Sequence, residues 1–281
     1  MPNNPIADPL VEGLDTDAVS QFVIVDATPE GLADVTINRP EQRNALNAEA
    51  IGALNSAFET LEGADGVRAV FLGGAGEAFS AGPDPQWLQD STDYTEGELR
   101  QDAMALAVAL KRLHDLPMLT IALVDGPAIG PGAGLAAACD FVIATERASF
   151  AFAEARHGLV AAVASPYLVA AVGAKRARGL LATARTLTAH EALAIGLVDE
   201  VVANVAGFAA ARERIAAQAS ACAPGAVAEA KHVVAHVAGR EIDHGLMEET
   251  ARRGARARLG DEGREGAAAV LEGRPPAWSA A

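Results

Sequence analysis

The chain has 281 residues, of which 51% are hydrophobic and only 4% aromatic, so its core must be built from alanine, valine, leucine and isoleucine. This length supports a sizeable core but is short for three domains. The formal net charge of −15 and a pI of about 4.8 repel nucleic-acid phosphates, and no basic stripe with aromatic residues occurs. Nucleic-acid binding is therefore excluded.

Cysteine usage and the termini indicate a cytoplasmic protein. Cys139 and Cys222 are far apart and have no CxxC partner, so neither a metal site nor a disulfide framework is expected. Residues 1–20 are polar and rich in proline and aspartate, which predicts a flexible arm and not a signal peptide. The charge-free segment 158–173 is too short to span a membrane and contains Pro166, so we expect it to be buried.

The first part of the chain alternates strands with helices. Asn47 is placed to cap a helix that continues to Leu61, and further helices are expected at about 98–113 and 132–138. Short apolar runs predict strands over residues 22–25, 35–37, 69–72, 119–124 and 141–144. This alternation predicts an α/β core over residues 21–200.

The chain becomes mostly helical after Gly173. Thr188 and Glu191 have the spacing of a capping box. Residues 205–271 are typical of helices, broken at Pro224-Gly225 and at Gly239. Because no low-complexity linker precedes this part, residues 201–281 are predicted to be a helical region of the same domain.

Two glycine-rich loops, residues 79–84 and 126–134, each precede a predicted helix. Such loops can aim backbone N–H groups at a negative charge that develops on a substrate oxygen. Both contain a proline, Pro83 and Pro131, which has no N–H to donate. A structural explanation is also available, because proline is favoured at the first position of a helix. Asp84 followed by proline has the same pattern of a helix cap.

Other nucleotide-binding and hydrolase motifs fail to match. The second loop lacks the third glycine of a dinucleotide fingerprint, because Leu135 stands at that position. The glycine run at 73–76 has no following Lys-Ser/Thr, so it is not a phosphate-binding P-loop. Ser80 does not lie in a GxSxG turn, which argues against a Ser-His-Asp triad.

Glu154 is the strongest candidate for acid/base chemistry. It lies in an apolar stretch, residues 150–158, and such surroundings can raise the pKa of a carboxylic acid toward neutral pH. The structural alternative, which composition alone favours, is an ion pair with Arg156 or a contact with a helix end. His157 can assist catalysis or be a structural histidine.

Ordered motifs cover nearly the whole chain, from about Phe22 to Trp278. At these residues the sequence resembles the enoyl-CoA hydratase/isomerase family, also called the crotonase superfamily. Residues 158–167 and the C-terminal part look most like bacterial members described as methylglutaconyl-CoA hydratase-like. The motifs are Asn38-Arg39-Pro40 with Asn44-Ala45-Leu46-Asn47, Phe79-Ser80-Ala81-Gly82-x-Asp84, Asp125-Gly126-Pro127-Ala128-x-Gly130, Ala138-Cys139-Asp140, Leu187-Thr188-Ala189-x-Glu191-Ala192, Gly196-Leu197-Val198, Arg264-Glu265-Gly266 and Arg274-Pro275.

The resemblance implies an α/β crotonase-like fold of repeated ββα units that form two stacked sheets flanked by helices. It also implies a helical C-terminal region that builds trimers, often paired into hexamers. The implied substrate is an acyl-CoA thioester, with coenzyme A as part of the substrate and no separate cofactor or metal.

The resemblance also assigns roles to the two loops. In such enzymes two backbone N–H groups hold the thioester oxygen, and their positions match Pro83 and Pro131. Hydratases of the family commonly use two glutamates, of which the first matches Gly134 and the second matches Glu154. The N–H groups of Asp84 or Gly132, one residue further along, are the expected replacements for the lost donors.

Further residues are expected around the substrate. The positions that often carry an aromatic residue and a lysine near the CoA adenine match Val270 and Gly273. The pocket candidates are Ser80, Ala81, Trp87, Gly134, His157, Ser165 and Tyr167. The CoA-binding candidates are Arg39, Arg43 and Arg274, although exposed loop arginines commonly have no phosphate to bind.

Three hypotheses about function follow. The first is an acyl-CoA hydratase or lyase, a carbon–oxygen lyase, with Glu154 as acid/base. The second is a crotonase-fold enzyme that performs a different reaction or uses a substrate other than a CoA thioester. It would hold its substrate oxygen with side chains such as Ser80, Ser165, Tyr167 or His157. The third is a non-catalytic homologue.

Overall fold

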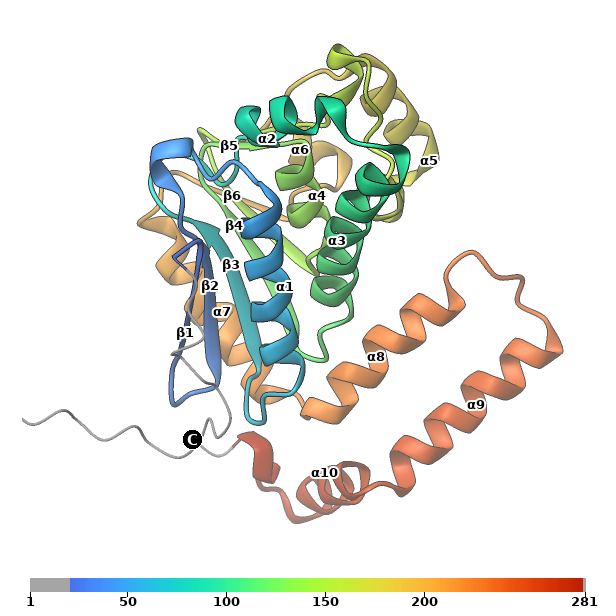
Figure 1. The fold of residues 1–281 in the computed structure, drawn as a ribbon. Coiled ribbons are helices and arrows are strands. Elements are labelled where there is room, and N and C mark those ends of the chain that lie inside the picture. Colours follow the sequence, from blue (N-terminus) through green and yellow to red (C-terminus); the bar gives the residue numbers. More distant parts are fainter. Residues whose placement is uncertain (1–20, 280–281) are drawn as a thin grey trace, which may run out of the picture.

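The computed structural model describes residues 21–279, so the arm predicted at residues 1–20 lies outside the described residues. Its larger sheet has six strands in the order β1-β2-β3-β4-β6-β9 (Figure 1). Only β1 and β2 pair antiparallel in this sheet, and the other neighbours pair parallel. The strands are β1 (Val23–Ala27), β2 (Leu32–Ile37), β3 (Ala69–Gly74), β4 (Leu119–Val124), β6 (Phe141–Thr145) and β9 (Glu200–Val202).

A second sheet of three strands contains β5 (Pro127–Ile129), β7 (Ser149–Ala151) and β8 (Leu187–Thr188). The units β4–β5–α4 and β6–β7–α5 repeat one arrangement: the first strand joins the large sheet and the second joins the small one. Here α4 is Pro131–Ala138 and α5 is Ser165–Thr183. The predicted fold of ββα repeats in two sheets is confirmed.

The large sheet is covered on both faces because its strands are apolar on both sides. Alternate residues of β3 belong to different clusters: Val70 and Leu72 pack toward α1 (Ala48–Glu62) and α3 (Glu96–Asp115), the two long helices on one face (Figure 1). Phe71 packs on the other face with α7 (Gly207–Ala221). This two-sided burial explains the uninterrupted hydrophobic runs.

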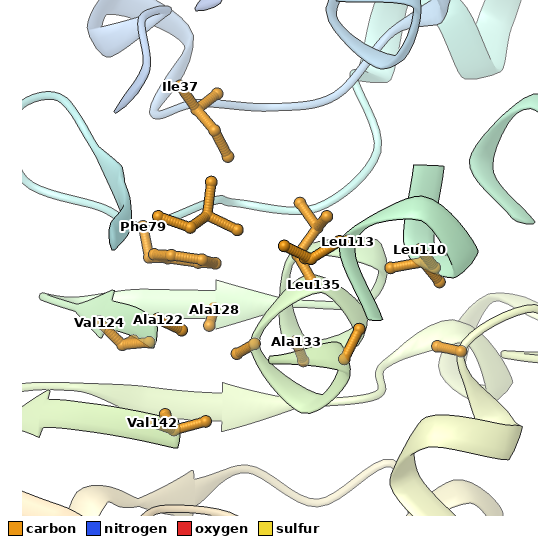
Figure 2. Packing of buried hydrophobic residues seen from close by; sticks show 14 of the residues in the cluster. Ile37, Phe79, Leu110, Leu113, Ala122, Val124, Ala128, Ala133, Leu135 and Val142 are labelled. Atoms are coloured by element: carbon orange, nitrogen blue, oxygen red, sulfur yellow. The ribbon is translucent and has the colours of Figure 1, made fainter. Parts of the chain in front are cut away.

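Small side chains allow α4 to approach its neighbours closely. Figure 2 shows Leu135 of α4 beside Leu113 of α3, within a cluster that includes Ala128 and Ala133. The two alanines and both leucines have no exposed surface. The alanine-rich composition therefore supports a close-packed core with few aromatic side chains.

The predicted helix ends are confirmed where local chemistry sets them. Asn47 accepts a hydrogen bond from the N–H of Ala50 at 2.9 Å and caps α1. Asp84 caps the short helix α2 (Pro85–Asp90), which is followed by η3 (Ser91–Asp93), and Pro131 is the first residue of α4. Thr188 caps α6 (Ala189–Ile195) in a full capping box.

The C-terminal helices α8 (Pro224–Val237) and α9 (His244–Leu259) extend away from the sheets (Figure 1). The chain returns through α10 (Asp261–Glu272) to η5 (Ala277–Ser279), where the Trp278 indole N–H donates to the carbonyl of Ala221 in α7. The breaks at Pro224 and Gly239 are confirmed, and a further break occurs at Gly260. The ammonium of Lys231 donates to Asp140 Oδ2 at 2.6 Å and fastens α8 to the core.

The apolar segment 158–173 is not buried as predicted. Val160 is 81% exposed and Leu159 is 49% exposed. Only Ala161, Ala164, Leu168 and Val172 are buried, at the spacing of one helix face. The segment is therefore a surface element whose exposed side is also largely apolar. In the described part of the chain, no helix combines the length and apolarity needed to cross a membrane.

Candidate active site

The carboxyl group of Glu154 lies where the two proline-bearing loops meet. Its Oε1 is 3.2 Å from the point that a Cβ on Gly130 would occupy. The Cδ atom of Pro83 is 3.7 Å from the same point. Pro131 directly follows Gly130 and begins α4. The carboxyl of Glu154, the first loop and the second loop are therefore neighbours.

The electrostatics of Glu154 favour a functional explanation over a structural one. Its Oε2 is buried and has no hydrogen-bond partner among the described residues. Burial raises the pKa of this carboxyl above its ordinary value, although a backbone hydrogen bond and the nearby His157 act in the opposite direction. Arg156 is exposed, and residues 21–279 contain no ion pair to Glu154. The expected pairing with Arg156 is thus absent from this region.

Strand pairing determines where Glu154 lies. β5 and β7 run parallel, and the N–H of Gly130 at the end of β5 donates to the carbonyl of Ala151 at the end of β7, at 2.7 Å. Glu154 follows three residues later and begins the short helix η4 (Glu154–His157). Gly130 has φ +52° and ψ −118°, a backbone conformation that favours glycine.

The first loop is pinned to the segment before α1. The N–H of Leu46 donates to the carbonyl of Gly82 at 2.8 Å, and the N–H of Asp84 donates to the carbonyl of Leu46 at 2.9 Å. The Asp84 N–H is therefore already used within the protein. This contradicts the expectation that it replaces the donor lost at Pro83.

The start of α4 retains the other expected donor. The first hydrogen bond of this helix joins the N–H of Gly134 to the carbonyl of Gly130 at 3.0 Å. No acceptor within residues 21–279 is recorded for the N–H of Gly132, which is buried. A Cβ on Gly132 would lie 2.6 Å from the Cβ of Ser80, so glycine is required for this close approach. Ser80 itself is fully buried and accepts from the N–H of Gly82 at 3.3 Å.

The position that matches the missing first glutamate is closed. A Cβ on Gly134 would lie 2.8 Å from the Cβ of Ala164, closer than real side chains approach, and 3.7 Å from Leu110. The methyl group of Ala164 thus stands where a longer side chain from α4 would begin. Glu154 has no second carboxylate from this position.

The remaining pocket candidates are dispersed. His157 is exposed, and the Ser165 hydroxyl donates to the carbonyl of Ala162 at 2.8 Å. Tyr167 stacks edge-on against His114 of α3 at 5.4 Å and lines a groove of about 480 Å³ between α3 and α5 that does not include Glu154. Ala81 and Trp87 are half-buried, with Trp87 packed on the main core.

Two of the three CoA-binding candidates are committed elsewhere. The Arg39 guanidinium donates to Asp84 Oδ2 at 2.8 Å and to the carbonyl of Ala45. Arg274 pairs with Glu265 and Glu272 in the C-terminal region, and it lowers the pKa of Glu265 to about 2. Arg43 is exposed, and its guanidinium forms no hydrogen bond or ion pair with any of residues 21–279.

Asn44 is a buried residue to which the sequence analysis assigned no role. Its amide nitrogen donates to the carbonyls of Ala75 and Ala78 at 2.8 and 2.7 Å, and its Oδ1 accepts from the N–H of Arg39 at 2.9 Å. Its φ of +57° is one that asparagine tolerates, so an asparagine in a polar loop was an available signal. Ala164 offered none, because alanine is abundant throughout the chain.

The two sheets built from ββα units, with two glycine-rich loops beside Glu154, have the arrangement of the crotonase-type fold. A model of the family described as enoyl-CoA hydratase/isomerase matches residues 27–281, and the chain belongs to that family. A Thermus thermophilus protein that carries a provisional enoyl-CoA hydratase name is 37% identical over 245 residues, covering 87% of this chain and 96% of that protein.

Solved structures show the same relationship. Pseudomonas aeruginosa AtuE is 31% identical with a TM-score of 0.88, covering 92% of this chain and all of that one. An enoyl-CoA hydratase from Shewanella pealeana is also 31% identical, with a TM-score of 0.87 and coverage of 92% and 96%. Another relative, a 4-chlorobenzoyl coenzyme A dehalogenase from Arthrobacter, is 34% identical over 61% of this chain and 63% of its own length.

Proposed function

We propose that this family member is a hydratase or lyase that acts on an acyl-CoA thioester, with Glu154 as its acid/base. The observation that carries the proposal is the buried, unpartnered Oε2 of Glu154 beside both glycine-rich loops. Burial raises the pKa of this carboxyl, which is the direction that general acid/base catalysis near neutral pH requires. The resemblance to methylglutaconyl-CoA hydratase-like proteins makes a thioester of the 3-methylglutaconyl-CoA type the expected substrate.

A single carboxyl must then serve both proton transfers. Because Ala164 closes the position at Gly134, Glu154 takes a proton from the attacking water and delivers one to the carbon next to the thioester. The N–H of Gly132, at the positive end of α4, is the donor for the thioester oxygen. Loss of one oxyanion donor costs on the order of 10²–10³ in rate, so a slow enzyme is expected.

The second candidate is a crotonase-fold enzyme with a different reaction or a substrate other than a CoA thioester. It is favoured by the lack of an N–H at Pro83 and Pro131 and by the use of the Asp84 N–H within the protein. The dehalogenase name of the Arthrobacter relative is compatible with such a change in chemistry. A non-catalytic role is the third candidate, which the unpartnered Glu154 carboxyl argues against.

One assay separates these candidates. The protein is mixed with crotonyl-CoA or 3-methylglutaconyl-CoA, and the enoyl-thioester absorbance is followed. We expect slow turnover by the wild type and a loss on the order of 10²–10⁴ in Glu154→Gln. If the wild type is silent while Pro83→Ala/Pro131→Gly gains activity, the simple hydratase function is wrong. Calorimetry with free coenzyme A then tests whether a CoA compound is bound at all.

A further inference from the structure

Arg39 and Asp84 form an ion pair that is almost completely removed from solvent. Their side chains are each 10% exposed, and Arg39 Nη2 lies 2.8 Å from Asp84 Oδ2. The second carboxylate oxygen of Asp84 accepts from the N–H of Gln86 at 2.9 Å and caps α2. Burial alone would raise the pKa of Asp84, but the hydrogen bonds from Arg39 and Gln86 lower it overall. Both charges are therefore fully used inside the protein.

The pair joins two segments that run side by side. The N–H of Ala81 donates to the carbonyl of Arg43 at 2.9 Å, and Leu46 is bonded to both Gly82 and Asp84. Arg39 contacts each segment, because its guanidinium also donates to the carbonyl of Ala45. We call Arg39, the Ala45 carbonyl and Asp84 the Arg39 clamp.

The Arg39 clamp fixes Pro83, because Pro83 lies between Gly82 and Asp84, which are both hydrogen-bonded to Leu46. Pro83 Cδ and Glu154 Oε1 both lie within 4 Å of one point beside Gly130. Proline has no N–H, so the Pro83 ring can present only apolar surface toward this point. A displaced ring would admit water to the carboxyl and favour its ionised form.

Few other groups act on this carboxyl. Of the described residues, His157 on η4 is the titratable neighbour that influences the pKa of Glu154. The first loop contributes Asp84, whose charge is paired with Arg39. The start of α4, β5 and β7 contribute no titratable side chain.

We propose that Arg39 is a positioning residue that acts through Asp84 to hold the Pro83 ring against Glu154 and to exclude water from one side of that acid. The observed basis is the Arg39–Asp84 ion pair and the proximity of Pro83 and Glu154 to one point beside Gly130. Its consequence for catalysis rests on the proposed role of Glu154. Arg39 thereby acquires a role different from the CoA binding that the sequence suggests.

The test measures the protonation of Glu154 without requiring turnover. The full chain is treated with a water-soluble carbodiimide and glycine ethyl ester over a range of pH, and labelling of the peptide with Glu154 is followed by mass spectrometry. Arg39→Met and Asp84→Asn are compared with the wild type. Asparagine keeps the acceptor for the Gln86 N–H, so the cap of α2 is retained. We expect both variants to lower the labelling midpoint by about 0.5 pH unit or more.

The two variants distinguish hydration from simple charge removal. Loss of the Arg39 charge alone would raise the midpoint, whereas loss of the Asp84 charge alone would lower it. If Arg39→Met does not fold, Arg39→Lys decides, because it keeps the charge but not the forked geometry. The control is Asp34→Asn, which removes a different ion pair, between β2 and Arg212 of α7 at 2.7 Å, and should leave the midpoint unchanged.

An unchanged or raised midpoint in the Arg39 variants overturns the proposal, as does an equal decrease in Asp34→Asn. Turnover of crotonyl-CoA is measured in the same variants. A decrease in kcat with little change in KM supports positioning of the acid. If the wild type has no turnover, the hydratase function fails while the labelling result still decides the role of Arg39.

Discussion

Glu154 combines two properties that rarely occur together in a structural carboxylate: burial and the lack of a partner for Oε2. Burial of an ionised carboxylate without a partner destabilises the folded state. An acid in this condition is typical of functional sites, where the cost is tolerated for the sake of proton transfer. The free energy of unfolding of a Glu154 variant therefore tests the state of this carboxyl without an activity assay.

We expect Glu154→Gln to stabilise the protein at neutral pH but not in acid. Because the folded pKa of Glu154 is raised, the folded state binds more protons, and its stability falls as pH rises from the unfolded value of about 4.3 through the folded value. Glutamine does not titrate, so the difference in the free energy of unfolding grows over that window. Urea unfolding at several pH values measures it.

The control for this prediction is Glu241→Gln, in the exposed loop between α8 and α9. We expect it to change stability by less than about 0.5 kcal/mol at every pH tested. A Glu154→Gln difference that is the same at acidic and neutral pH would show that folding does not raise the pKa of this carboxyl.

At the scale of elements, the site depends on how α4 meets the start of α5. Gly134 and Ala164 bring the two helices together, and a Cβ at position 134 would lie 2.8 Å from that of Ala164. The neighbour is a methyl group fixed to the backbone, so it cannot rotate away. This contact explains why the position cannot accept a larger side chain without a shift of α5.

Gly134→Ala should destabilise the protein by roughly 1–3 kcal/mol through overpacking. Ala164→Gly in the same chain should recover part of the loss, because the two sites are coupled. The matched control is Gly52→Ala in α1, where nothing lies within 4 Å of the new Cβ and alanine should stabilise the helix by up to about 1 kcal/mol. Thermal and urea unfolding provide the values, and a neutral Gly134→Ala would disprove the contact.

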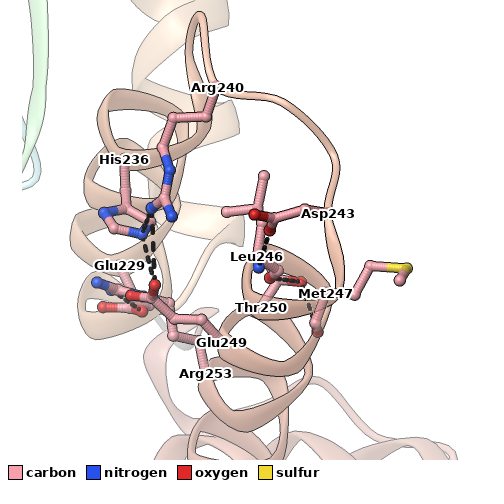
Figure 3. A network of polar contacts seen from close by, with 9 residues as sticks. All are labelled: Glu229, His236, Arg240, Asp243, Leu246, Met247, Glu249, Thr250 and Arg253. Atoms are coloured by element: carbon pink, nitrogen blue, oxygen red, sulfur yellow. Dashed lines mark hydrogen bonds and ion pairs between the residues drawn. The ribbon is translucent and has the colours of Figure 1, made fainter.

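At the scale of the whole molecule, the C-terminal helices leave apolar side chains exposed that the single chain does not cover. α8 has no buried residue, and Val270 and Leu271 of α10 are 82% and 87% exposed. A groove of about 950 Å³ opens between α8, α9 and α10. Polar contacts join α8 to α9, such as His236 with Glu249 at 2.7 Å (Figure 3), and Glu249 also lines the groove.

The exposed apolar surface supports the proposal of a homo-oligomer, either a trimer or a hexamer. Sedimentation equilibrium should give a multiple of the chain mass of 28.7 kDa. Leu271→Asp together with Leu259→Asp should shift the protein toward monomers, because both side chains are largely exposed in the single chain. Circular dichroism checks that the helices persist. A wild type that is monomeric at micromolar concentration contradicts the proposal.

Much of the architecture could be predicted because its causes are local. The Asn47 and Thr188 caps, the proline at the start of α4 and the strand runs all depend on a few neighbouring residues. The proximity of Glu154 to the two loops was predictable only through the resemblance to a family. The prediction that segment 158–173 is buried was wrong, because a lack of charged residues does not show which side of a helix faces the core.

The helix caps, the strands and the lack of N–H donors at Pro83 and Pro131 follow from the amino-acid sequence alone, because these are properties of single residues and short runs. The tertiary structure decided that Leu46 occupies the Asp84 N–H, that Ala164 closes the position at Gly134, and that Arg39 is bound to Asp84. Each of these contacts joins residues that are far apart in the chain. Their partners are set by how the sheets and helices pack, which no local pattern specifies.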